Sequence, residues 1–305
     1  MLFRSISIHL KDLALSVRAV EKRTATTKDI RRLRGIGSAF GGARPKASVT
    51  DDQGSLHIAK FSVTGERLAT EKMEVATQWL AGAVGIRSCE AQIVTNRDFD
   101  PVALIKRFDR TSNGKRIQYI SARTMLNVGS AVGSTYTEIA YAIRAHGDDS
   151  TGQLRELFRR VAFNVLVSNV DDHLSNHGFL HVSEGKWRLA PMFDVNPAPE
   201  RANTLKTAIS EVSGNEASIE AVLDVANEFG LSMDQGAAII RHMATFISNN
   251  WKDFARRAEM SAGEIRAYTD AFEHQQSKFA VGLWTTKITA RHNDDNRNGK
   301  DVEFE

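Results

Sequence analysis

Short runs of alternating hydrophobic and polar residues dominate the first 110 positions. Residues 46–50 and 55–61 predict a β-hairpin, because the polar turn sequence DDQG joins two runs of strand-like composition. Residues 66–84 predict a helix that ends at Gly85, with apolar side chains every three or four positions. These side chains are Met73, Ala76, Leu80 and Val84. Further strands are expected at residues 91–94 and 101–107, which together predict a small α+β lobe.

Longer helical patterns follow. Residues 151–168 predict a helix with one apolar face, which would pack into a core and fix the position of the next loop. Two short strands are expected at residues 178–182 and 187–189. The last third is predicted to be helical, with an apolar face and two pairs at the spacing of capping boxes. The face is Ile219, Val222, Leu223, Ala226 and Phe229; the pairs are Ser232 with Gln235 and Ser261 with Glu264.

Length and composition fit two lobes of an ordinary globular protein. The chain has 305 residues, 42% of them hydrophobic and 25% charged, and no apolar run reaches the roughly 20 residues that span a bilayer. The first ten residues lack a signal-peptide core and a cleavage site, so we predict a cytoplasmic protein. We place a small mixed lobe at residues 1–110, an α-rich lobe at 111–290 with a cleft between them, and a disordered tail at 291–305.

Cysteine content and charge exclude some functions. Cys89 is the single cysteine, which excludes an intramolecular disulfide, and we interpret it as a structural thiol. The net charge of +3 is modest, although residues 22–34 carry six Lys or Arg. That basic stretch has no interleaved aromatic residues and no recognition-helix pattern. We interpret it as a solvated face and do not expect direct nucleic-acid binding.

A glycine-rich segment, GIGSAFGG at residues 35–42, precedes the hairpin. Glycines let backbone N–H groups approach phosphate oxygens closely, and Lys46 follows the segment. Its context matches neither a Rossmann fingerprint nor GxxxxGK[ST], and a plain turn is the alternative. Lys60, near the end of an apolar strand, is a candidate to neutralise nucleotide phosphates, with Glu74 on the next helix as its partner. An ordinary surface lysine is the alternative there.

Two later segments carry residue types suited to phosphoryl transfer. Asp171 and Asn176 have the Asp-x4-Asn spacing of a kinase catalytic loop, in which a carboxylate orients the attacking hydroxyl and an amide oxygen holds magnesium. Asp194 follows an aromatic residue at the end of a predicted strand. Because phosphate oxygens supply other ligands, one such carboxylate beside Asn176 suffices for Mg2+.

The order of these motifs resembles that of the HipA-like kinases. The matching segments, between about residues 35 and 197, are GSAFGGARPKA, LHIAKF, LIKRFDR, ISARTML, FNVLVSNVDDHLSNHGFL and WRLAPMFDV. The resemblance implies a two-lobed protein-kinase-like fold of the phosphatidylinositol-kinase-like variant. It also implies an ATP- and Mg2+-dependent serine/threonine protein kinase that acts as the toxin of a toxin–antitoxin pair.

The resemblance also implies a role for each matching residue. Asp171 becomes the catalytic base, His173 orients its loop, and Asn176 and Asp194 become the metal ligands. ATP would be bound by Lys60 with Glu74, by Gly37, Ser38, Gly41, Gly42 and Lys46, and by a hinge from Lys106 to Phe108. Ser38 falls at the autophosphorylated serine of the family, where a phosphate would disfavour the phosphate-cradling loop conformation.

Two departures from the family pattern affect these expectations. Lys106 stands where the longer toxin has an acidic residue, so we expect the hinge to bind adenine through its backbone. Only 34 residues precede the glycine-rich segment, which resembles short HipA-like kinases whose N-terminal subdomain is a separate small protein. Expected partners are that protein, a helix-turn-helix antitoxin, and a protein substrate such as an aminoacyl-tRNA synthetase.

Three other readings remain open from the sequence. His173, His177 and His181 recur every four residues and could bind zinc on one helix, but Gly178 and the following strand pattern interrupt such a helix. Serine-hydrolase chemistry at Ser38 lacks the G-x-S-x-G elbow. A catalytically impaired or truncated HipA-like binding module, acting through partner proteins, is the third reading.

Overall fold

The computed structural model describes residues 4–33, 44–63, 65–111, 113–129, 133–200 and 203–283, with side chains from Leu10 onward. The glycine-rich segment at 35–42 therefore lies outside the described residues, as does the tail at 291–305. Among the described residues, no helix is long and apolar enough to cross a membrane.

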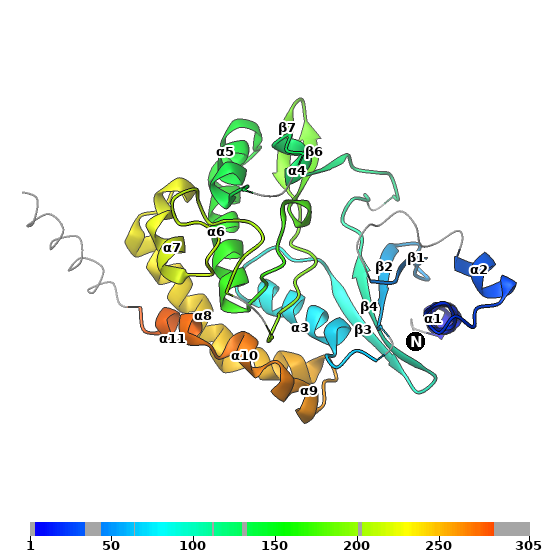
Figure 1. Ribbon diagram of the computed structural model, residues 1–305. Coiled ribbons are helices and arrows are strands. Elements are labelled where there is room, and N and C mark those ends of the chain that lie inside the picture. The colour runs from blue at the N-terminus through cyan, green and yellow to red at the C-terminus, as the bar shows by residue number, and fades with distance from the viewer. Residues whose placement is uncertain are drawn as a thin grey trace, which may run out of the picture.

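A four-stranded antiparallel sheet forms the first part of the molecule (Figure 1). Its strand order is β1-β2-β4-β3, and β1 pairs with β2 so that Lys46 lies opposite Lys60. The predicted turn is present: Asp51 Oδ1 accepts hydrogen bonds from the amides of Gln53 and Ser55, and Gly54 has φ +80°. The bounds are β1 Lys46–Thr50, β2 Leu56–Phe61, β3 Ala91–Asn96 and β4 Phe99–Lys106.

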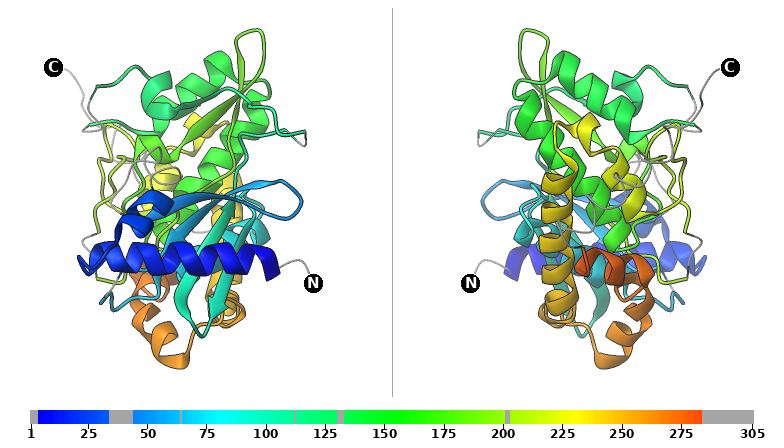
Figure 2. Two further views of the ribbon diagram at one scale, coloured as in Figure 1. Left: turned by 90° about the vertical axis from the view of Figure 1, so that its right-hand side faces the viewer. Right: turned by 90° about the vertical axis from the view of Figure 1, so that its left-hand side faces the viewer.

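Helices cover both faces of this sheet, and Figure 2 shows α1 (Arg4–Glu21) lying across one of them. Alternate residues of β4 face opposite sides of the sheet: Val102 and Leu104 pack with α1, whereas Ala103 and Ile105 pack with α3 (Thr70–Ala83). A strand that is apolar on both faces is buried on both. The apolar stripe of α1 is Leu10, Leu13 and Val17.

The second part is rich in helices and shares one continuous core with α3. The long helix α8 (Met233–Arg257) and helix α6 (Ser150–Leu166) run through it, and a three-stranded sheet of order β5-β6-β7 lies beside the cavity described below. The strands are β5 Tyr119–Ser121, β6 Gly178–Ser183 and β7 Lys186–Leu189. The remaining helices here are α4 Ala122–Met125, α5 Tyr136–His146, α7 Ile219–Asp224, α9 Ala262–Ala267, α10 Thr269–Phe272 and α11 Gln275–Val281, with 3-10 turns at Leu174–Asn176 and Ala226–Phe229.

Most predicted elements are present, and some were missed. The α+β architecture is confirmed, and both capping boxes form at the starts of α8 and α9. No helix was predicted for α1, for α2 (Thr27–Leu33) or for α5. The boundary between lobes at residue 110 stays a prediction.

Candidate functional site

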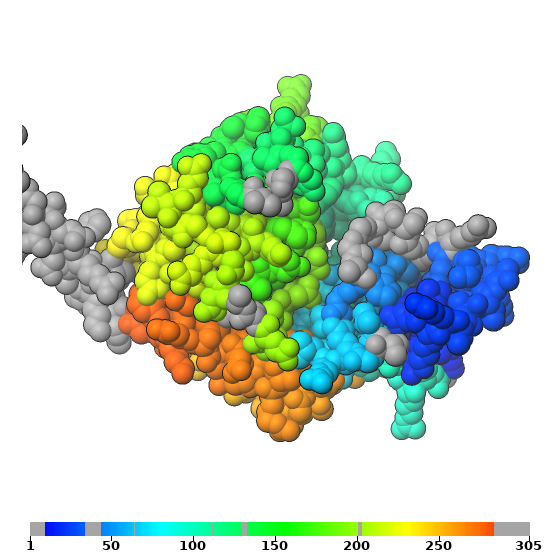
Figure 3. Space-filling view, viewed as in Figure 1, coloured from blue at the N-terminus to red at the C-terminus, as the bar shows by residue number. Residues whose placement is uncertain are grey.

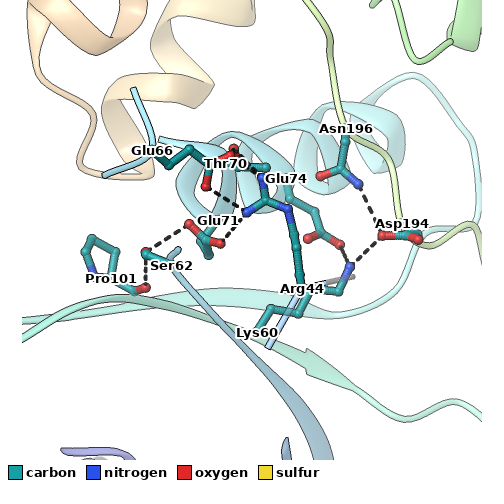
Figure 4. A network of polar contacts seen from close by, with 10 residues as sticks. All are labelled: Arg44, Lys60, Ser62, Glu66, Thr70, Glu71, Glu74, Pro101, Asp194 and Asn196. Carbon is teal, nitrogen blue, oxygen red and sulfur yellow. Dashed lines mark hydrogen bonds and ion pairs between the residues drawn. The ribbon is translucent and has the colours of Figure 1, made fainter. Parts of the chain in front are cut away.

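A buried lysine on the first sheet meets two carboxylates from different parts of the chain (Figure 4). Lys60 Nζ, on β2, lies 2.5 Å from Glu74 Oε1 on α3 and 2.7 Å from Asp194 Oδ1 after β7. Glu74 is 2% exposed and Lys60 is 9% exposed. The structure thus joins three predicted site residues that are up to 134 positions apart in the sequence.

The charges of this cluster stabilise one another. Burial lowers the pKa of Lys60, but the nearby carboxylates of Glu74 and Asp194 outweigh it, so the net pKa lies above the usual value for lysine. Burial opposes ionisation of Asp194, yet the charge and hydrogen bond of Lys60 and the charge of Lys46 keep its pKa below the ordinary range. Burial, followed by the charge of Lys60, lowers the pKa of Lys46. Two cationic side chains therefore face the same space.

Asp194 is held in an unusual backbone conformation. Its φ is +58°, in the left-handed region that few residues other than glycine adopt. Asn196 Nδ2 donates a hydrogen bond to Asp194 Oδ1 at 3.1 Å. In the part of the chain that the structure describes, the hydrogen bonds to this carboxylate all end on Oδ1, which leaves Oδ2 for another cation.

A cavity of about 530 Å3 opens next to this cluster, within the size range of roughly 300–1,000 Å3 for small-molecule sites. Figure 3 shows the face on which the two parts of the molecule meet. Predicted site residues from both parts line the cavity together with several apolar side chains. The predicted ones are Lys46, Lys60, Glu74, Lys106, Phe108, His173, Asn176 and Asp194; the apolar ones include Ile58, Cys89, Ile105, Tyr119 and Phe193.

Aromatic rings form part of the cavity wall. The ring centroid of Phe108 lies 5.5 Å from that of Phe193 and 5.9 Å from that of Tyr119. Gly178 on β6 permits this packing, because a Cβ at that position would lie 2.2 Å from Tyr119 Cε2. Cys89 lies in the same wall, where burial raises the pKa of its thiol to about 12, in keeping with a structural thiol.

The predicted hinge begins at Lys106, the last residue of β4. Lys106 forms an ion pair with Glu90 at 2.8 Å. The backbone amide of Lys106 donates to Glu90 O, and that of Arg107 donates to Leu56 O. Among the described residues the amide of Phe108 donates no backbone hydrogen bond, and Phe108 lines the cavity.

The two adjacent aspartates of the predicted catalytic loop lie in opposite environments. Asp171 is exposed and does not line the cavity, although His173 and Asn176 from the same loop do. Asp172 is 3% exposed. Its Oδ2 accepts hydrogen bonds from Tyr136 Oη at 2.6 Å, His177 Nε2 at 2.6 Å and Asn164 Nδ2 at 2.8 Å. These bonds anchor the loop at the residue next to Asp171.

Arg44, which the sequence analysis did not single out, ties the start of the hairpin to α3 (Figure 4). Its guanidinium donates to Glu71 at 2.9 Å, to Glu66 and to Thr70. Glu71 is 3% exposed and also accepts from Ser62 Oγ at 2.9 Å. Helix α3 therefore presents two buried glutamates, one turn apart, each paired with a cation from the sheet side.

Some predicted residues lie outside the described part. Gly37, Ser38, Gly41 and Gly42 are among them, so their placement stays a prediction.

The zinc hypothesis finds no support in the positions of the histidines. Within the described ranges, no group of three or more His, Cys, Asp or Glu side chains could hold a metal ion. His177 is bonded to Asp172, and the His181 ring packs edge-on against Trp187. The donors that could hold a cation are instead Asp194 and Asn176, both on the cavity wall. Carboxylate and amide oxygens suit magnesium, which takes its other ligands from water and phosphate.

Comparison with known proteins agrees with this architecture. The family model of the HipA-like C-terminal domain matches residues 38–251. The chain belongs to this family. A structural match is the HipA protein of Shewanella oneidensis, solved with HipB and operator DNA: the TM-score is 0.67 at 14% identity, over 90% of this chain and 72% of that one. Identity this low shows the shared fold alone.

Two further matches have a lower TM-score or cover less of this chain than the Shewanella protein does. The Helicobacter pylori proinflammatory kinase CtkA gives a TM-score of 0.49 at 16% identity, over 77% of this chain and 94% of that one. A Haemophilus influenzae protein described as a putative kinase is 30% identical over 125 residues, which are 37% of this chain and 36% of that protein. The chain thus matches little more than a third of that curated relative.

Proposed function

We propose that this HipA-family chain is an ATP-dependent serine/threonine protein kinase. The observation that carries the proposal is the contact of Lys60 with both Glu74 and Asp194 at the wall of a nucleotide-sized cavity. In kinases, a lysine held by a helix glutamate contacts the ATP phosphates, and a nearby aspartate binds their magnesium. The description of the Haemophilus relative as a putative kinase supports the same activity.

The lining of the cavity suggests how ATP would be held. The adenine ring fits among the apolar side chains of Ile58, Ile105 and Phe193, with the Phe108 amide as a hydrogen-bond donor. Lys60 and Lys46 would then neutralise the phosphates. Magnesium would supply charge neutralisation at the phosphate oxygens when bound between Asp194 and Asn176.

The exposed loop would receive the protein substrate. Asp171 is outside the nucleotide cavity but in the same loop as Asn176, which suits a base that must reach a hydroxyl on another protein. Its carboxylate would orient the serine or threonine Oγ and accept the proton as the γ-phosphate is transferred in line. The Asp172 hydrogen bonds keep this loop in one position before substrate arrives.

Family likeness extends the proposal to partners and regulation. The Shewanella HipA was solved with HipB and DNA, and we extend this to a helix-turn-helix antitoxin partner for this chain. An aminoacyl-tRNA synthetase is the proposed substrate, a separate N-terminal-subdomain protein a proposed partner, and Ser38 the proposed site of autophosphorylation.

Transfer of labelled γ-phosphate from ATP to protein tests the proposal. The wild type should label a protein substrate or itself, and Asp171→Asn should lower the rate on the order of 10²–10⁴-fold while ATP binding persists. Asp253→Asn is a matched control, because it removes an exposed carboxylate that pairs with Arg256 on α8. If both proteins bind Mg·ATP, and if they transfer phosphate equally or not at all, the proposal is overturned in favour of a binding module. Mass spectrometry of the wild-type product reports on Ser38.

A further inference from the structure

Three asparagines connect the two loops that carry the proposed reactive groups. Asn164 is on α6, Asn169 opens the catalytic loop, and Asn196 follows Asp194 by two residues. Asn164 and Asn169 are 0% and 1% exposed. Amides buried to this degree normally use their donors and acceptors within the protein.

The hydrogen bonds of these asparagines follow one another without a break. The backbone amide of Asn196 donates to Asn169 Oδ1 at 3.1 Å, and Asn169 Nδ2 donates to Asn164 Oδ1 at 3.0 Å. Asn164 Nδ2 donates in turn to Asp172 Oδ2 at 2.8 Å. At the other end, Asn196 Nδ2 donates to Asp194 Oδ1 at 3.1 Å, as Figure 4 shows. One path therefore runs from the proposed metal ligand to the buried anchor of the catalytic loop.

We propose that this asparagine relay sets the position of Asp194 relative to Asn176 and Asp171, with Asn169 as its central positioning residue. The inference rests on the proposed function, because it concerns the placement of the groups that would hold magnesium and receive the substrate. A shift of either loop that breaks one of these hydrogen bonds leaves a buried amide group unpaired, which is costly. The three bonds from the Asn196 backbone amide through Asn169 and Asn164 to Asp172 run in one direction, and such consecutive bonds polarise and strengthen one another.

The chemistry of the asparagine side chain suits this task. The side-chain amides of Asn164 and Asn169 each accept one hydrogen bond and donate the next, whereas Asn196 joins the path with its backbone amide and its side-chain Nδ2. None of the three adds a charge beside Asp194. The left-handed backbone at Asp194, φ +58°, is a further reason for external support, since a strained residue persists when its surroundings fix it. Groups that orient the ligands of a metal commonly change metal affinity by about 10–100-fold when removed.

Binding of adenylyl-imidodiphosphate, with and without magnesium, tests the relay without turnover. For the wild type, the ratio of the two affinities measures the contribution of the metal. We expect Asn169→Ala to reduce this ratio by about tenfold and to leave metal-free binding within about twofold. Ser277→Ala is the matched control: it removes another buried hydrogen bond, from Ser277 Oγ to Leu166 O at 3.3 Å, that touches neither loop. Its magnesium ratio should equal that of the wild type at a comparable loss of thermal stability.

Asn196→Ala keeps the backbone bond to Asn169 but removes the donor to Asp194, so it should reduce the ratio as well. Because both variants cut one path, the double variant should lose no more than about twofold beyond the larger single effect. The relay would be overturned if the effects of the two single variants on the ratio multiply in the double variant. It would also be overturned if Asn169→Ala lowers the melting temperature but leaves the ratio unchanged. Absence of any magnesium effect in the wild type would instead contradict the proposed function itself.

Discussion

Removing the charge of Glu74 tests the central ion cluster most sharply. In Glu74→Gln, the ammonium of Lys60 keeps Asp194 at 2.7 Å but loses the carboxylate at 2.5 Å. Breaking a buried pair outright costs about 3–5 kcal/mol. Here Asp194 remains and the glutamine oxygen can still accept, so we expect a loss of about 1.5–2 kcal/mol in the free energy of unfolding, in the lower part of the roughly 1.5–3 kcal/mol range for a hydrogen bond to a charged group. This corresponds to a decrease of roughly 3–8 °C in melting temperature.

The effect on phosphoryl transfer should be larger than the effect on stability alone explains. Without Glu74, Lys60 binds Asp194 alone and is no longer held toward the phosphates. A loss of about 2 kcal/mol of transition-state stabilisation slows the reaction roughly 30-fold. Labelled-phosphate transfer at saturating ATP and a thermal melt measure the two quantities.

Glu71→Gln provides the matched control for this experiment. Glu71 is on the same helix, one turn away and equally buried, but it pairs with Arg44 and Ser62. We expect a similar decrease in melting temperature with the transfer rate kept within about threefold. Equal rates in Glu74→Gln and the wild type, or equal rate losses in both glutamine variants, would refute the role assigned to the Lys60–Glu74 pair.

Further predictions concern the cavity wall, the metal site and the loop anchor. Gly178→Ala should push the Tyr119 ring into the cavity, costing about 1–3 kcal/mol of stability and weakening ATP binding in calorimetry; unchanged affinity would contradict the assigned cavity wall. The pKa of Asp194 lies below its unfolded value of 3.8, so its stabilising charge is present above about pH 4 and is lost as the pH falls through the folded pKa. The melting-temperature difference between the wild type and Asp194→Asn should therefore shrink from pH 6 to pH 3, and a constant difference would argue against the ion pair. Asp172→Asn should cost about 3 kcal/mol or more in denaturant unfolding, because three donors converge on one buried oxygen; a neutral change would show that the loop has other anchors.

Local patterns were sufficient to predict most of the sheet and helix α3. The hairpin could be predicted from its turn sequence, because the aspartate side chain and the glycine of the turn act within five residues. Helix α3 could be predicted from its apolar spacing. Helix α3 begins at Thr70 rather than at residue 66. The Glu66 carboxylate instead accepts a hydrogen bond from Arg44, which is 22 positions away. Local periodicity cannot detect an interaction over this separation.

The first helix was missed although its signal was present. Leu10, Leu13 and Val17 have helical spacing and are buried against the sheet. The first ten residues were interpreted only as a possible signal peptide, and this stripe extends beyond them to Val17. The basic residues after it belong partly to α2, where Arg32 pairs with Asp12 of α1.

The reactive groups were predictable by type and spacing, whereas their supports were not. Asp171 and Asp172 are adjacent residues of the same type, and only the fold determines that Asp171 is exposed whereas Asp172 accepts three hydrogen bonds. Asn169 likewise gains its role from the backbone amide of Asn196, which follows β7, and Asn164 from its hydrogen bonds with Asn169 and Asp172. Buried polar networks of this kind depend on where several distant segments meet, so a single sequence gives no signal for them.

A crystal structure with magnesium and adenylyl-imidodiphosphate would show whether the cavity is the nucleotide site. We expect adenine in the cavity near the Phe108 amide, phosphates at Lys60, and a metal ion about 2.1 Å from oxygens of Asp194 and Asn176, with the terminal phosphate facing Asp171. A nucleotide bound elsewhere on the chain, or in the cavity with its phosphates pointing away from Lys60 and Asp194, would contradict it.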